Sequence, residues 1–183
     1  MNKSMVFTLL MAVVLVSCKT PEARRPITVS SGSFINESVT RNQERIAQEI
    51  ESIERILKKD TTKTYAATQS GFYMRYVQKD SLANGLKPKF GDRVVFDYQI
   101  SDLNGNVIYS KEELSPKEYV IDKQELISGL REALKMMQVG ESLDLILPSF
   151  KGYGYYGDEN KIGVNVPLRI TVKLTKLEPT IIN

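Results

Sequence analysis

The sequence has no histidine, no tryptophan and a single cysteine among its 183 residues. Without histidine, the Ser-His-Asp and Cys-His nucleophile systems are excluded. One cysteine allows neither an intramolecular disulfide nor a Cys/His metal cluster. An excess of one charge is also lacking, because 25 Lys and Arg are balanced by 22 Asp and Glu, for a net charge of +3. A chain this balanced is not a dedicated nucleic-acid binder, so we expect no nucleic-acid partner.

The N-terminal apolar run is too short to cross a membrane. Met5 to Val16 is an uncharged run of twelve residues, whereas a spanning helix needs about 20. We interpret residues 1–17 as a signal peptide. Leu15-Val16-Ser17-Cys18 resembles a bacterial lipobox, which implies lipidation of Cys18 and a membrane anchor; the alternative is an unmodified Cys18 in a cleaved signal. Lys19 stands where many inner-membrane lipoproteins have Asp, which by that resemblance favours the outer membrane, facing the periplasm.

Three segments are expected between the anchor and the folded domain. Residues 18–38 are rich in polar residues and Pro, which predicts a flexible tether after the lipidated cysteine. Residues 39–60 are predicted to be an amphipathic helix, with an apolar stripe at helical spacing formed by Ile46, Ile50, Ile53 and Leu57. That stripe fits a second copy of the chain, a partner protein or the chain's own domain. Residues 61–70 show no periodicity and are predicted to be a linker.

Residues 71–183 are predicted to form the folded domain, because apolar and polar residues alternate there as in half-buried strands. The strand faces are Phe72-Met74-Tyr76, Val94-Phe96-Tyr98-Ile100, Leu143-Leu145-Leu147 and Leu168-Ile170-Val172-Leu174. Asn104-Gly105 predicts a hairpin. One helix is expected across Leu126 to Met137, with Asp122 as its N-cap. These elements predict an α+β fold: a curved antiparallel β-sheet wrapped on one short amphipathic helix, with an N-terminal helical extension.

A series of short motifs resembles the FKBP-type peptidyl-prolyl cis-trans isomerases. In order, they are Gly91-Asp92, Asp97-Tyr98, Leu103 to Ile108, Lys123 to Leu130, Met137 to Glu141, Gly152-Tyr153-Gly154 and Val172 to Leu174. Together with the lipobox and the helical extension, they make the whole chain most similar to the gliding-motility-associated isomerase lipoproteins of Bacteroidota. The resemblance implies an FKBP-like fold that isomerises X-Pro bonds in proline-containing polypeptide clients, with no cofactor and no metal.

The resemblance also implies which residues form the site. The catalytic positions are Tyr98, Ile127 and Tyr153, with the N–H of Ile127 and the hydroxyl of Tyr153 donating to substrate carbonyls. The substrate-binding positions are Ile108, Tyr109, Glu125, Leu126, Leu130, Ile162 and Ile170. Leu130 would form the floor in place of the commoner tryptophan. Ile108-Tyr109 replaces a Phe-Asp pair, so a carboxylate is missing, and one aromatic residue is replaced near Lys117 and another by Ile170.

The residues themselves carry part of this interpretation. Tyr153 stands between two glycines in a polar segment and has little packing reason to be there, which favours display at a site. Leu126, Leu130 and Ile170 would be apolar in any fold and fit a core equally well. Asp158-Glu159 is a pair of adjacent carboxylates, which fits a solvated loop better than a hydrolase site.

Three functions therefore remain open. The first is an isomerase that assists folding of exported or motility-related proteins. The second is a catalytically weak chaperone or binding module on the same fold. The third is a structural component of an envelope or motility complex, held through the Ile46 to Leu57 stripe.

Overall fold

The computed structural model describes residues 32–60, 62–79 and 85–180. The predicted signal peptide, Cys18 and most of the predicted tether lie outside these residues. Thr40–Asn183 form one compact unit, and the described residues before it are the first turns of helix α2. No helix in the described ranges is long and apolar enough to cross a membrane.

Helix α2 spans Gly32–Lys59 and begins earlier than the sequence predicted. The prediction of a tether through residue 38 and a helix from residue 39 is therefore corrected, because residues 32–38 are helical. The polar composition of residues 32–38 hid a helical spacing, since Ile35 stands four residues before Val39. Lys58 and Lys59 lie in the last turn, where positive charge is favourable for the helix dipole.

The sheet is antiparallel throughout, and its path is β1-β2-β6-β7-β3-β4, with β5 also paired to β3. The strands are β1 (Ala66–Ala67), β2 (Tyr73–Gln78), β3 (Arg93–Ser101), β4 (Val107–Tyr109), β5 (Lys117–Val120), β6 (Ser142–Leu147) and β7 (Leu168–Glu178). The short helices are α3 (Lys111–Leu114), α4 (Ser128–Leu134) and the 3-10 helix η1 (Ser149–Lys151). The hairpin predicted at Asn104-Gly105 joins β3 to β4. Strands β1 and β5 were not predicted, and β1 lies inside the predicted linker.

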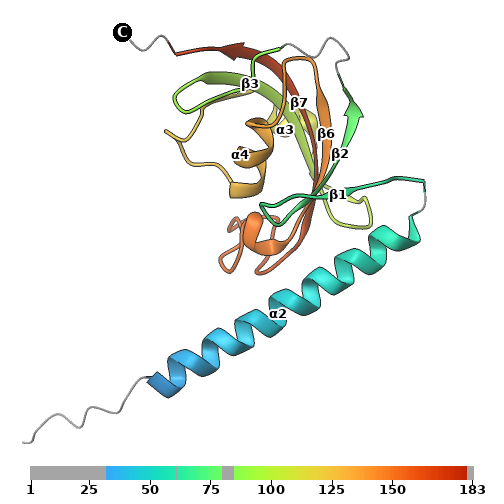
Figure 1. Ribbon diagram of the computed structural model, residues 1–183, viewed down its shortest axis with the longest axis vertical. Helices are drawn as coiled ribbons and strands as arrows, with labels where there is room; N and C mark the ends of the chain where they lie inside the picture. Colours follow the sequence, from blue (N-terminus) through green and yellow to red (C-terminus); the bar gives the residue numbers. More distant parts are fainter. Residues whose placement is uncertain (1–31, 61, 80–84, 181–183) are drawn as a thin grey trace, which may run out of the picture. The chain divides into compact units, whose positions relative to one another are not determined.

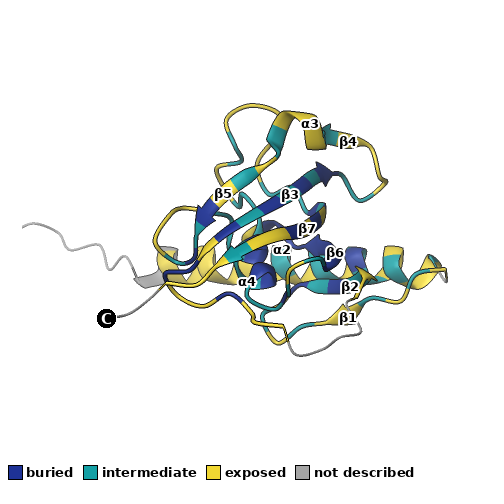
Figure 2. Cartoon of the chain, turned by 90° about the horizontal axis from the view of Figure 1, so that it is seen from above, coloured by how far each residue is buried: buried dark blue, intermediate teal, exposed yellow. Residues whose placement is uncertain are grey.

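One hydrophobic core lies between the sheet and α4 (Figure 1). Leu130, Ala133 and Leu134 of α4 are fully buried in it together with the predicted faces of β3, β6 and β7. Figure 2 shows these buried positions concentrated in the central strands and in α4. The predicted α+β architecture is confirmed, including the single helix against a curved antiparallel sheet.

Asp122 does not cap α4. The helix begins at Ser128 with Ile127 in the N-cap position, while Asp122 has a positive φ of 58°. Its carboxylate accepts a hydrogen bond from Lys135 Nζ at 3.0 Å and lies 3.5 Å from Arg131 Nε. Asp122 therefore links the loop before α4 to the side chains of Arg131 and Lys135, and it does not cap the N-terminus of the helix.

The Thr40–Lys59 part of α2 packs against the folded domain. Ile53 of the predicted stripe is fully buried, whereas Ile46, Ile50 and Leu57 are partly buried. On either side of Ile53, Glu49 is hydrogen-bonded to Ser149, and Glu54 accepts a hydrogen bond from the Tyr73 hydroxyl at 3.2 Å. The chain's own domain thus buries part of the apolar stripe of α2.

Candidate active site

A cavity of about 550 Å³ opens between β3, the loop before α4 and the flap, by which we mean residues 148–167 between β6 and β7. It is lined by Tyr98, Lys117, Gln124, Glu125, Leu126, Ile127, Leu130, Arg131, Gly152 and Tyr153. All three predicted catalytic positions and three of the predicted substrate-binding positions, Glu125, Leu126 and Leu130, are brought together here. Residues from four separate segments therefore meet at one opening.

Besides Leu126 and Ile127 in the loop before α4, the cavity has apolar lining from α4 and from β3. Leu130 lies in the first turn of α4, is fully buried and lines the cavity. Tyr98 is the third of four inward-facing residues of β3, and its ring lies 5.3 Å from the ring of Phe96 between centroids. Burial raises the pKa of Tyr98, so its hydroxyl is neutral at physiological pH. A leucine and a tyrosine thus provide a floor and a wall without charge.

Tyr153 is positioned by the backbone of the flap. The N–H groups of Gly152 and Gly154 both donate to the carbonyl of Ser149, at 3.0 and 2.9 Å. Gly154 has a φ of +60°, which glycine adopts without strain and which lets the chain turn immediately after Tyr153. Burial first, and then the nearby ionisable groups of Tyr98, Asp158 and Tyr109, raise the pKa of Tyr153 to about 12. Its hydroxyl therefore keeps its proton and can donate a hydrogen bond into the cavity.

Most of the polar lining of the cavity, namely Lys117, Gln124 and Arg131, was not predicted from the sequence. Arg131 and Gln124 left no local signal, since each looks like an ordinary surface residue of a loop or helix. Gln124 accepts a hydrogen bond from the N–H of Val120 at 2.9 Å, and Arg131 is the ion-pair partner of Asp122. Lys117 did leave a signal, because the family resemblance indicated a replaced aromatic residue near it. The cavity is accordingly more polar than its apolar floor alone suggests.

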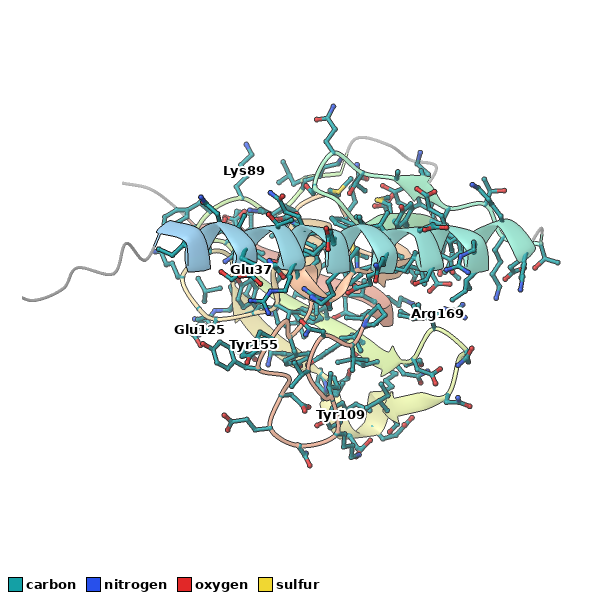
Figure 3. The ribbon with its side chains drawn as sticks, turned by 90° about the horizontal axis from the view of Figure 1, so that it is seen from below. Glu37, Lys89, Tyr109, Glu125, Tyr155 and Arg169 are labelled. Carbon is teal, nitrogen blue, oxygen red and sulfur yellow. The ribbon has the colours of Figure 1, made fainter. Side chains whose placement is uncertain are left out.

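Four predicted substrate-binding residues do not line the cavity. Ile162 and Ile170 are buried in the hydrophobic core, and Ile108 and Tyr109 pack against that core from β4. The Tyr109 hydroxyl donates a hydrogen bond to Asp158 in the flap (Tyr109 is labelled in Figure 3). Tyr109 thus links β4 to the flap, and its role in binding substrate stays a prediction.

Asp158 has a structural role that the sequence did not indicate. Its carboxylate also accepts the backbone N–H groups of Asn160 and Ile162, at 3.0 and 2.7 Å. Burial acts to raise the pKa of Asp158, but the hydrogen bonds from Tyr109 and these amides outweigh it and lower the pKa. The charged form of Asp158 therefore organises the flap loop, and it forms no acid/base pair with Glu159.

Two exposed aromatic side chains extend from the same flap. Tyr155 and Tyr156 are 72% and 82% exposed, and their rings meet edge to face with centroids 5.5 Å apart. Tyr155 projects outward from the flap loop (Figure 3). Neither residue is among those that line the cavity.

The lining residues of the cavity combine apolar surface with a small number of polar groups. Leu130 contributes apolar surface, and the Tyr153 hydroxyl is a neutral donor. Within the described ranges, no group of three or more His, Cys, Asp or Glu side chains could bind a metal ion.

Comparison with known proteins assigns the family. Residues 85–175 match the family of FKBP-type peptidyl-prolyl cis-trans isomerases. The chain is 34% identical over 90 residues to FK506-binding protein 2 of Dictyostelium discoideum, covering 49% of this chain and 68% of that protein. It is 35% identical over 80 residues to a short-type peptidyl-prolyl cis-trans isomerase of Methanocaldococcus jannaschii, covering 36% of this chain and 50% of the relative. The chain belongs to the FKBP-type peptidyl-prolyl cis-trans isomerase family.

Solved structures share the fold at lower sequence identity. A peptidyl-prolyl cis-trans isomerase from Pseudomonas syringae superposes with a TM-score of 0.58 at 22% identity, covering 73% of this chain and 96% of that one. FkpA from Escherichia coli superposes with a TM-score of 0.59 at 20% identity, covering 98% of this chain and 83% of that one. Both support the FKBP-like architecture described above.

Proposed function

We propose that the cavity lined by Leu130 and Tyr153 is the site at which this isomerase turns over X-Pro bonds. The observation that carries the proposal is the protonated hydroxyl of Tyr153 at the rim of a cavity whose floor is the fully buried Leu130. The proline ring would bind over Leu130, and Tyr98 would exclude water from one side. Glu125 and Leu126 would contact the peptide backbone on either side of the proline.

The proposed reaction is rotation about the X-Pro peptide bond, and it breaks no covalent bond. Rotation about a peptide bond has a barrier of about 18–20 kcal/mol because amide resonance is lost in the twisted state. A catalyst must bind that twisted state more tightly than either planar isomer. An apolar floor favours an amide that has lost part of its dipole, and fixed donors can hold the neighbouring carbonyls in place. The Tyr153 hydroxyl is one donor, and the N–H of Ile127 is the other.

The N-terminal position of Ile127 supports its role. Ile127 is the N-cap residue of α4, and N–H groups at the start of a helix have no acceptor within the helix. Its amide is thus available to a ligand that enters the cavity. No proton transfer is needed at any step, which is consistent with a chain that has no histidine.

The site is tested by exchange spectroscopy on an Ala-Leu-Pro-Phe peptide with the full chain. Tyr153→Phe removes the hydroxyl and keeps the ring, and we expect it to lower kcat/KM about tenfold, as for loss of one hydrogen bond of about 1.4 kcal/mol. Tyr155→Phe is the matched control, because it makes the same change on an exposed residue of the same flap. Equal activity of the two variants would remove Tyr153 from the site.

We also propose that the chain is a lipoprotein of the cell envelope, anchored by lipid on Cys18 and facing the periplasm from the outer membrane. The support is Leu15-Val16-Ser17-Cys18 directly after an apolar run of signal-peptide length. Its clients would be exported proteins, including motility proteins, that contain slow X-Pro bonds. Labelling with a fatty-acid analogue should mark the wild-type chain and not Cys18→Ser, and an equally labelled variant would contradict the anchor.

A second candidate is a binding module with weak catalysis that also serves as a component of an envelope or motility complex. Lys117 in the cavity and a leucine floor favour it, since both make the cavity less aromatic than the family resemblance implies. The part of α2 that stays accessible, such as the 39% exposed Ile56, would contact a second copy or a partner protein. This hypothesis predicts saturable peptide binding with little acceleration of exchange, and loss of the complex in Ile56→Lys. Strong acceleration of exchange by the wild type would contradict the first part, and an intact complex in Ile56→Lys would contradict the second.

A further inference from the structure

The start of the flap is hydrogen-bonded to helix α2 by a single carboxylate. Ser149 is fully buried, and its backbone N–H donates to Oε1 of Glu49. Its hydroxyl donates to Oε2 of the same glutamate at 2.7 Å. Arg45 Nη1 donates to Glu49 Oε2 at 3.2 Å and to the Ser149 hydroxyl at 3.3 Å. Both oxygens of Glu49 are therefore used on one residue that lies 100 positions further along the chain.

Ser149 also holds the turn that contains Tyr153 through backbone hydrogen bonds. Its carbonyl accepts the N–H groups of both Gly152 and Gly154, the two neighbours of Tyr153. A displacement of Ser149 would thus move both hydrogen bonds that define the turn. The other side of the flap base is fixed to α4, because Lys151 Nζ forms an ion pair with Glu132 at 3.0 Å.

From this geometry we propose that Glu49 is a positioning residue for the isomerase site, acting through Ser149 on the turn that carries Tyr153. The proposal rests on the proposed function, in which Tyr153 donates to the substrate. Without Glu49, the buried N–H and hydroxyl of Ser149 lose their acceptor, and a flap base moved toward solvent becomes competitive. Only the undisplaced flap presents Tyr153 to the cavity.

A simpler explanation is that Glu49 only fastens α2 to the domain, and the structure offers a control for it. The Tyr73 hydroxyl donates to Glu54 at 3.2 Å, which is another side-chain bond between the same helix and the sheet. This bond reaches β2 and not the flap. Tyr73→Phe therefore weakens docking of the helix without touching Ser149.

The two explanations differ in the kinetic constant that changes. When only a fraction of the molecules is competent to bind, the apparent affinity falls by that fraction, while the bound complex is unaltered. For Glu49→Gln in the full chain, we expect KM for an Ala-Leu-Pro-Phe peptide to rise about five- to tenfold, with kcat within about twofold of wild type. Hydrogen exchange of the Gly152 and Gly154 amides should be faster in this variant. Tyr73→Phe should lower the melting temperature and leave KM and these amides unchanged.

Ser149→Ala provides a second variant in case Glu49→Gln does not fold. It removes the hydroxyl but keeps the N–H bond to Glu49, so its KM should rise by less than that of Glu49→Gln. An unchanged KM in both variants, or an equal change in Tyr73→Phe, would overturn the positioning role. Failure of the proposed function is a different result, because it appears as normal activity in Tyr153→Phe whatever the Glu49 variants do.

Discussion

Arg169 binds the buried carboxylate of Asp144 through two nitrogens, with Nε 2.9 Å from Oδ1 and Nη2 2.6 Å from Oδ2. Asp144 is 1% exposed, and it also accepts from Arg75 Nη2 at 2.9 Å and from the Tyr65 hydroxyl at 2.8 Å. These bonds connect β6 with β7, with β2 and with the residue before β1. The carboxylate of Asp144 in β6 therefore connects β7, β2 and the residue before β1 by hydrogen bonds, on the face of the sheet opposite the core.

Asp144→Asn should destabilise the protein by about 3 kcal/mol, because two partly buried arginines would lose the charge that compensates them. Urea unfolding followed by circular dichroism measures this change. Glu118→Gln is a suitable control, since it removes one charge from an exposed pair with Arg93, which is worth at most about 1 kcal/mol. Equal midpoints for the two variants would show that the Asp144 cluster adds little to stability.

The same cluster should make stability depend on acidity. Burial acts to raise the pKa of Asp144, but hydrogen bonds from Arg169 and Tyr65 outweigh it and lower the pKa below 3.8. The unfolded chain then binds the proton more readily, so the contribution is complete above about pH 4 and is lost as pH falls through the folded pKa. Between pH 4 and pH 2, wild type should lose more stability than Asp144→Asn. Parallel losses in the two proteins would contradict the assignment.

Gly129→Ala should destabilise the protein although alanine is the better helix former by about 1 kcal/mol. A Cβ at this position would lie 2.6 Å from Leu147 Cδ2 and 3.1 Å from the Lys151 carbonyl oxygen. Leu147 is fully buried, so relief requires α4 to move away from the base of the flap. We expect a net loss of about 1–3 kcal/mol, as for overpacking of a core. A variant as stable as wild type in thermal unfolding would mean that the contact relaxes freely.

Peptide turnover should be insensitive to deprotonation of Tyr153 across pH 7 to 10. With a pKa of about 12, the hydroxyl remains a donor throughout this range, whereas a tyrosine at the ordinary value of 10.0 would be half ionised at the upper limit. Exchange rates measured at constant ionic strength test this expectation. The ratio of wild type to Tyr153→Phe isolates the hydroxyl from other titrating groups, and a ratio that falls with a midpoint near pH 10 would contradict it.

Much of the fold could be predicted because alternation of apolar residues reports directly on burial. Val94, Phe96 and Leu145 were assigned to the core from this pattern alone, and they are fully buried. Strand β6 was expected to be half buried, but both of its faces are buried. Its outward side includes Asp144. A carboxylate in an alternating strand is expected to be exposed to solvent, but Arg169 and Tyr65 bind and bury it in the folded protein. Strands β1 and β5 have two and four residues, too few for alternation to be recognised.

The site was predictable where a single position carried the signal. Tyr153 stood out because two glycines in a polar segment give an aromatic ring no local packing partner. The pairs that fix the flap could not be found in this way, since Tyr109 and Asp158 are 49 residues apart and Glu49 and Ser149 are 100 residues apart. Both pairs depend on the tertiary fold, because nothing in the neighbouring residues favours one distant partner over another.

The central claim is that isomerisation occurs in the cavity lined by Leu130 and Tyr153. A second cavity of about 540 Å³ lies between the end of α2 and β1, with Leu57, Tyr65 and Tyr73 in its lining, and it provides an internal comparison. The most direct test is an amide NMR titration of the full chain with Ala-Leu-Pro-Phe, with cis/trans exchange of the peptide recorded in the same samples. We predict accelerated exchange together with the largest saturable shifts at Ile127, Gly152 and Tyr153. Accelerated exchange with the shifts clustered at Tyr65 and Tyr73 would contradict the account.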